Sequence, residues 1–117
     1  MRRHYLDKCL AVEVGPNAAL LFDYFAHTTV RNMERGENVS GGKVWTYTTA
    51  KDGQRSYSYM SEWQVKSALH KLQDAGLLEK GGPVNTPRGR ATAYTVPHDR
   101  AQAHCAAIRE LYGREAE

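Results

Sequence analysis

Apolar residues recur at helical spacing between residues 61 and 75, and helix-boundary residues stand at both ends of this stretch. The apolar stripe consists of Val65, Leu69 and Leu72. Ser61 and Gln64 have the S-x-x-Q spacing of a capping box, in which each side chain binds an amide at the helix start. Gly76 stands where a left-handed cap would end the helix. The pattern therefore predicts a helix over 61–75.

Two strand-like runs follow this helix, at residues 77–78 and 92–96. The chain between them is rich in Gly, Pro and Asn and contains Arg88 and Arg90, so it is predicted to be a basic loop. A helix followed by a basic β-hairpin is the layout of a winged helix-turn-helix, in which the helix enters a DNA groove and the wing over 77–96 contacts phosphate.

The chain before residue 61 contains several shorter patterns. Residues 10–14 are predicted to form a short strand, and Pro16 suits the first turn of a helix that continues to about Met33. Residues 35–42 are predicted to be a loop, and residues 44–49 a strand rich in β-branched and aromatic side chains. One face of the helix is apolar, formed by Leu20, Leu21, Tyr24, Phe25 and Thr28.

Residues 49–59 allow two interpretations. Asp52-Gly53 between aromatic runs is a hairpin signal, whereas Thr49 can cap a short second helix in which Gly53 costs about 1 kcal/mol. The helix is favoured because a helix-turn-helix requires it.

The chain after the wing is predicted to form a helix over about 98–113, capped by Asp99. Its apolar stripe can pack on the domain or on a second copy of the chain, which gives a possible homodimer. The stripe consists of Ala101, Cys105, Ile108, Leu111 and Tyr112.

Four segments together resemble the winged-helix domains of phage and plasmid replication initiators and replisome organisers. They are GPNAALLFDYFAH, KVWTYTT, SEWQVKSALHKLQDAGLL and RATAYTV, and they span roughly residues 10–96. The resemblance implies an α+β fold: a small winged helix-turn-helix with a three-helix core, a β-hairpin wing and an additional C-terminal helix, within one domain over 1–117. It also implies double-stranded DNA as the partner.

Composition and charge are consistent with this interpretation. The chain is 41% hydrophobic and 25% charged, as is usual for globular proteins, and it has no apolar run long enough for a membrane helix. Residues 43–96 contain eight Lys and Arg against four Asp and Glu, so the net positive charge lies in the predicted DNA-binding part. No signal peptide is recognised and the two cysteines lack metal-site spacing, so a reduced cytoplasmic chain is expected.

The candidate DNA-binding residues lie on the predicted recognition helix and on the wing. Gln64 can address adenine and Lys66 guanine, because residues in the first turns of such a helix reach base edges. Trp63 is expected either to pack beneath the wing or to contact the partner. The full candidate set is Ser61, Trp63, Gln64, Lys66, Ser67, His70, Lys71, Arg88 and Arg90.

Other chemistry finds little support in the sequence. Phosphate-loop, nucleophile-elbow and H-E-x-x-H motifs are all missing, so we expect no enzyme and no cofactor. The residues considered as metal ligands have no close ligand spacing, so no metal site is predicted. They are His4, Cys9, His98, His104 and Cys105.

The resulting hypothesis is a DNA-binding protein of a phage, prophage or plasmid, acting as a small regulator or replication accessory. The alternative is a mobile-element-encoded inhibitor of a host nucleic-acid enzyme, such as an anti-CRISPR protein, that uses the same scaffold to bind protein. The protein partners considered are a host nuclease and a replication protein. Modest charge and Ser67 at a position that is often basic in the family favour this alternative. A third hypothesis is a dimerisation unit built on the C-terminal helix.

Overall fold

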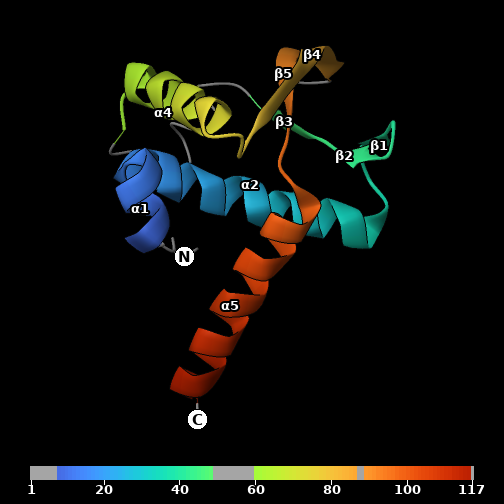
Figure 1. Ribbon diagram of the computed structural model, residues 1–117. Coiled ribbons are helices and arrows are strands. Elements are labelled where there is room, and N and C mark those ends of the chain that lie inside the picture. The colour runs from blue at the N-terminus through green and yellow to red at the C-terminus, as the bar shows by residue number, and fades with distance from the viewer. Residues whose placement is uncertain (1–7, 49–59, 87–88, 117) are drawn as a thin grey trace.

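Helix α2 (Pro16–Arg35) is the element on which the other helices pack. Contacts reach it from α1 (Lys8–Val14), α4 (Glu62–Asp74) and α5 (His98–Ala116), which lie around it in Figure 1. The computed structural model describes residues 8–48, 60–86 and 89–116. Within these residues the four helices and two small antiparallel sheets give an α+β fold, as expected.

Helix α2 is buried on more than one side because it is sandwiched between other elements. Phe25, which was expected in the core, is buried, but so are Phe22 and Asp23 on a part of the helix outside the predicted stripe. Pro16 lies in the first turn, as predicted. The helix ends two residues beyond the expected Met33, where the left-handed Gly36 closes its last turn.

Residues 10–14 were expected to form a strand, and this prediction is wrong, because they belong to helix α1. An alternating strand would bury Leu10, Val12 and Val14 on one face. Instead Leu10 and Val14, one helical turn apart, are buried against the core, and Val12 is 89% exposed. Packing on α2 therefore determines the conformation of this short segment.

The expected loop over 35–42 contains part of a small hairpin. Strand β1 (Val39–Ser40) pairs with β2 (Lys43–Val44) across Gly41 and Gly42. Both glycines have positive φ, as a two-residue hairpin turn of this kind requires. The Gly-Gly pair between Val39 and Val44 was the sequence signal for this turn.

A second sheet has the strand order β3–β5–β4, with β3 (Thr46–Thr48), β4 (Glu79–Thr86) and β5 (Gly89–Thr95) all antiparallel. The strand predicted at residues 77–78 is wrong in position, since β4 begins at Glu79. The loop that was expected after it is shorter than predicted, because β4 continues through the Gly- and Pro-containing segment. Pro83 is accommodated because β4 is an edge strand.

Trp45 packs over the part of β4 that contains Gly81. The pairing of β4 with β5 shifts register between Lys80 and Pro83, which forms a bulge at this point. A Cβ atom on Gly81 would lie 2.7 Å from the Trp45 ring and 3.3 Å from Ala93, so only glycine fits here without a shift. Trp45 Nε1 also donates a hydrogen bond to the Ser40 carbonyl at 3.2 Å, which links the two sheets.

Helix α4 begins and ends as predicted. The Ser61 hydroxyl accepts a hydrogen bond from the Gln64 backbone N–H at 3.1 Å, and the Gln64 side-chain oxygen accepts one from the Ser61 backbone N–H at 2.7 Å. At the other end, Gly76 has a φ of 74°, and the Leu77 backbone N–H donates a hydrogen bond to the Leu72 carbonyl at 2.9 Å. The predicted stripe is confirmed, since Val65, Leu69 and Leu72 are all buried.

Helix α5 starts at His98, so Asp99 lies in its first turn and is not the cap that was expected. His98 instead connects this helix to β2, because its Nε2 accepts the Val44 amide at 3.1 Å. Ala101, Cys105 and Ile108 of the predicted stripe are buried within the chain, whereas the side chains of Leu111 and Tyr112 lie outside the described part. The homodimer stays a prediction.

Apolar side chains from all four described helices and from the end of β5 form one core. Phe25 of α2 and Tyr94 of β5 meet there with ring centroids 5.6 Å apart. Burial raises the pKa of the Tyr94 phenol above its ordinary value. In the described part of the chain, no helix has the length and apolar character needed to cross a membrane.

Candidate nucleic-acid interface

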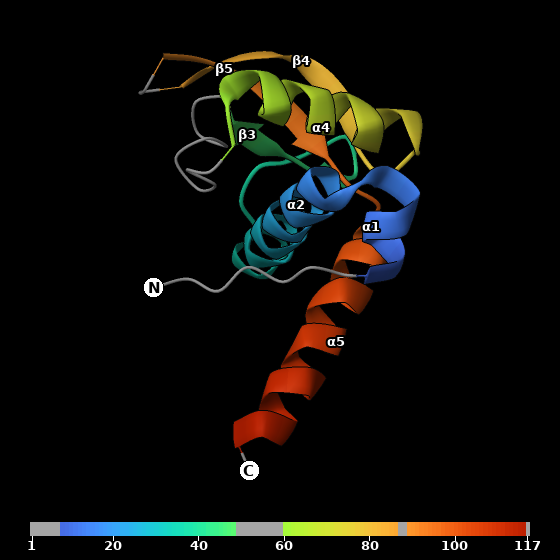
Figure 2. The same ribbon diagram turned by 90° about the vertical axis from the view of Figure 1, so that its left-hand side faces the viewer.

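Helix α4 packs on α2 with one face and leaves the opposite face in solvent. Figure 2 shows α4 beside the β4–β5 hairpin at one end of the molecule, with α5 extending from the other end. Six of the predicted site residues on or next to α4 are exposed, and Ser67 is partly exposed. The exposed residues are Ser61, Trp63, Gln64, Lys66, His70 and Lys71.

Ser61 and Gln64 hold the start of α4 through the capping box, which affects their use as ligand contacts. Adenine readout by glutamine needs the amide oxygen and the amide nitrogen together. The Gln64 oxygen already accepts the Ser61 amide, so such a contact competes with a cap that stabilises the helix by about 0.5–2 kcal/mol. Gln64 is therefore better placed to support the helix start than to read a base.

Lys66 extends from the middle of the exposed face of α4. Its Nζ lies 3.7 Å from Glu62 Oε1, one turn earlier, and both side chains are well exposed. An exposed pair of this type contributes only about 0.3–0.5 kcal/mol. Lys66 can therefore exchange Glu62 for another anion at little cost.

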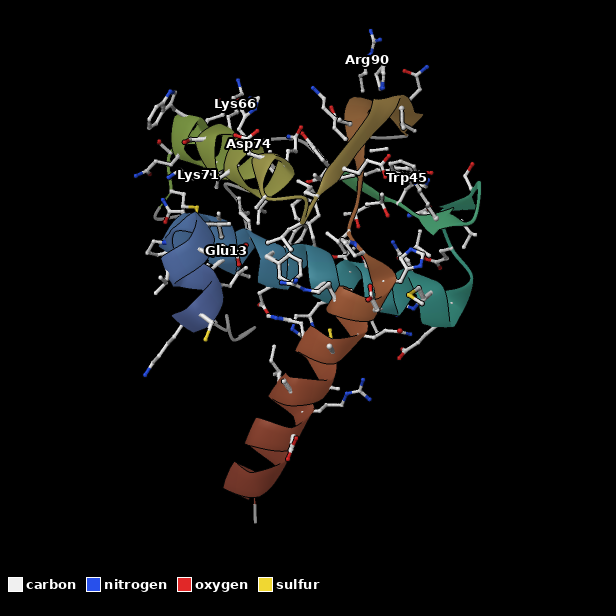
Figure 3. All side chains as sticks on the ribbon, in the orientation of Figure 1. Glu13, Trp45, Lys66, Lys71, Asp74 and Arg90 are labelled. Atoms are coloured by element: carbon white, nitrogen blue, oxygen red, sulfur yellow. The ribbon has the colours of Figure 1, made fainter. Side chains whose placement is uncertain are left out.

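Arg90 lies on β5, opposite Asn85 of β4, on the returning arm of the hairpin as predicted. Figure 3 shows Arg90 and Lys66 on the same side of the molecule, both pointing away from α2 and α5. Arg88 was expected beside Arg90, but it lies outside the described residues, as do residues 49–59, where a second helix was favoured.

Lys71 lies apart from Lys66, on the edge of α4 that is nearer to α1 (Figure 3). A Cβ atom on Gly15 would lie 3.7 Å from Lys71 Nζ, so this ammonium group stands at the junction of α1 and α2. A depression of about 290 Å³ lies here, lined by residues of the α1–α2 junction and by Trp63, Gln64, Ser67 and Lys71. Four predicted site residues thus surround one concave surface.

Trp63 is 75% exposed at the start of α4. The expectation that it packs beneath the wing is therefore wrong, and its alternative role as a contact residue stays a prediction. Most of the indole surface is in water, where apolar area is unfavourable. Trp63 is the largest apolar group on the rim of the depression.

A buried polar cluster, not foreseen from the sequence, lies where α2 meets α5. Asp23 Oδ1 lies 2.7 Å from His104 Nε2 and 3.1 Å from His27 Nε2. Cys105 Sγ lies 3.6 Å from His27 Nδ1. The i,i+4 spacing of Asp23 and His27 was visible in the sequence. His104 and Cys105 were considered as metal ligands, but nothing there joined them to Asp23, which lies 81 residues before His104.

Comparison with known proteins found no match. No family model matches the chain, and neither a curated protein nor a solved structure matches it.

Proposed function

We propose that the protein binds double-stranded DNA, with α4 as the recognition helix and the β4–β5 hairpin as the wing of a winged helix-turn-helix. The observation that carries the proposal is the position of Lys66 and Arg90 on one side of the molecule, on two neighbouring elements (Figure 3). A helix and a hairpin that present cations in the same direction can contact a groove and the adjacent phosphates together.

The distribution of charge supports this orientation. The Lys and Arg excess of the chain falls within residues 43–96, which include α4 and the wing. Phosphate contacts supply most of the affinity of such proteins for duplex DNA. Because the excess is small, affinity should be modest and should depend strongly on salt.

The contacts have different expected roles. Lys66 exchanges its weak pair with Glu62 for phosphate or for a guanine edge, and Arg90 contacts phosphate or enters the minor groove. His70, exposed on the same helix, is assigned to phosphate. From the resemblance of its sequence to winged-helix domains, we propose that the protein acts as a regulator or replication accessory of a phage, prophage or plasmid.

The test is an anisotropy titration of a labelled mixed-sequence duplex at several salt concentrations. Affinity should fall steeply between about 50 and 200 mM salt, because bound counterions are released. Arg90→Ala should weaken binding to all sequences and reduce the salt slope by about one unit. Lys66→Ala should have at least the same effect.

Arg109→Ala is the matched control, since Arg109 is an exposed cation on α5, which extends away from α4 (Figure 2). It removes the same charge and should leave affinity nearly unchanged. Equal losses from Arg90→Ala and Arg109→Ala would mean that only net charge matters, and the proposed orientation would be wrong.

A second candidate function is binding of a protein, as in an inhibitor of a host nucleic-acid enzyme. Exposed Trp63 beside the 290 Å³ depression favours it, because tryptophan is frequent among the residues that dominate protein interfaces. Absence of duplex binding at low salt would favour this function over the first. Trp63→Ala should then abolish partner binding without unfolding the chain.

A further inference from the structure

The polar cluster between α2 and α5 has the composition of a metal-binding site. It places one carboxylate oxygen, from Asp23, and two imidazole nitrogens, from His27 and His104, within 4.8 Å of one another. Two imidazoles and a carboxylate suit borderline divalent transition-metal ions, of which zinc is the commonest structural example. We propose that these three residues bind such an ion and that it joins α5 to α2.

The side chains would have to rotate to accept an ion. Ligand atoms around a tetrahedral zinc lie about 3.3 Å apart when each bond is about 2.0–2.1 Å long. The two distances from Asp23 Oδ1, 2.7 Å to His104 Nε2 and 3.1 Å to His27 Nε2, are shorter than this value by about 0.6 and 0.2 Å. The two imidazole nitrogens, which lie within 4.8 Å of each other, would have to approach by up to about 1.5 Å, through rotation of side chains.

Helix geometry and packing hold the three ligands in place. Asp23 and His27 lie one turn apart on α2, so their side chains project from the same face of one rigid helix. The His104 ring packs edge-on against Phe22, with ring centroids 5.4 Å apart and an interplanar angle of 89°. A site built on two packed helices loses little conformational freedom when an ion binds.

Cys105 provides a partner for the second nitrogen of one imidazole. A carboxylate only accepts hydrogen bonds, so with Asp23 ionised each Nε2 that faces it carries hydrogen. When Nε2 of a neutral imidazole binds an ion, this hydrogen moves to Nδ1. For His27, Nδ1 faces Cys105 Sγ at 3.6 Å, the position of an outer-shell hydrogen-bond acceptor. The thiol is therefore assigned to orienting His27 and not to the ion.

The cluster is least buried on the His27 side, where we expect the fourth coordination position. The side chains of Asp23 and His104 are 1% and 5% exposed, whereas His27 is 36% exposed. Three protein ligands with an open fourth position leave room for water or for a donor group from a partner. The site lies at the contact of α2 with α5 and is independent of α4 and the proposed DNA interface.

The test is calorimetric titration of the chelator-treated, reduced full chain with zinc, repeated with cobalt to record the visible d–d spectrum. The wild-type chain should bind one equivalent with nitrogen and oxygen ligands. His27→Gln should weaken binding by about 100-fold, and Cys105→Ala, which removes an outer-shell partner, by about 10-fold. His70→Gln, which replaces an exposed histidine on α4, is the matched control and should bind as the wild type does.

Several results would overturn the proposal. They are the absence of zinc binding by the wild-type chain, equal affinity in the wild type and His27→Gln, or an intense cobalt–thiolate charge-transfer band. Because His27 is partly exposed, its variant should keep the helical circular dichroism of the wild type. If it does not fold, the imidazole nitrogen resonances of His27 and His104 in the wild type decide, since metal binding must shift both and absence of a shift excludes the site.

Discussion

Helices α4 and α5 both pack on α2, but with different chemistry. The contact with α4 is apolar and includes Leu69 and Leu72, whereas the contact with α5 includes Asp23 and His104 in a buried hydrogen bond. Figure 1 shows that α5 extends from α2 in the direction away from α4. One helix thus takes part in two kinds of contact, one non-directional and one that requires specific atoms to meet.

The two contacts should tolerate substitution to different extents. Apolar packing depends on volume and pattern, and cores accept swaps that keep both. A buried carboxylate depends on its individual partners, because removing one leaves a polar group without its hydrogen bond in a poorly solvated site. Substitutions on each side of α2 can test whether the two contacts differ in this way.

The largest effect is expected on the apolar side. Leu72→Ala, at a fully buried position, should lower the free energy of unfolding by about 2–5 kcal/mol, because it opens a cavity between α4 and α2. Urea unfolding followed by circular dichroism measures this. Lys66→Ala on the exposed face should change stability by less than about 0.5 kcal/mol. If the lysine variant unfolds instead, the buried face of α4 has been assigned incorrectly.

On the polar side, Asp23→Asn should destabilise the chain by about 1.5–3 kcal/mol, since it replaces a charged acceptor by a neutral one with almost no change in volume. Asp74→Asn is the control, because Asp74 is an exposed acidic residue at the end of α4. Unfolding curves in a chelator-containing buffer measure both. Equal stability of the two variants would show that the negative charge of Asp23 contributes nothing to the cluster.

A third test extends the comparison to a contact that depends on shape alone. Gly81→Ala should cost about 1–3 kcal/mol, because the added methyl group would lie 2.7 Å from the Trp45 ring. In Gly82→Ala the same methyl group meets nothing within 4 Å, so this variant should be nearly neutral. Thermal unfolding distinguishes them, and similar melting temperatures would mean that Trp45 does not pack there.

The smallest effect concerns a local interaction within α4. Ser61→Ala should lower stability by about 0.5–2 kcal/mol, because it removes the hydroxyl that accepts the Gln64 amide. Ser67→Ala, an identical change inside the helix, should be neutral or slightly stabilising, since alanine favours helix interiors. Urea unfolding measures both, and a more harmful Ser67→Ala would contradict the assigned helix start.

The same division between local and long-range contacts explains which predictions succeeded. The capping box, the apolar stripe and the Gly76 end of α4 are all encoded within 16 consecutive residues, and all are confirmed. The helical conformation of residues 10–14 depends on packing against α2, and the length of β4 depends on pairing with β5. Neither dependence is visible in local composition.

The candidate sites differ in the same way. The exposed face of α4 follows from its stripe, so the positions of Lys66, His70 and Lys71 in solvent could be predicted. The Asp23 cluster could not, because it joins residues from helices at opposite ends of the chain. Exposure of Trp63 was left open, since no local pattern decides whether a distant hairpin covers a side chain.

The two tryptophans also give the chain two distinct optical reporters. Trp63 is 75% exposed on α4, whereas Trp45 is partly covered and packs against the hairpin at Gly81. Water-exposed indole emits at longer wavelength and is quenched more readily by dissolved iodide. A ligand that covers α4 should therefore shift and protect the long-wavelength emission, while loosening of the hairpin should alter the short-wavelength emission. Unlabelled protein can thus report occupancy and integrity in a single fluorescence spectrum.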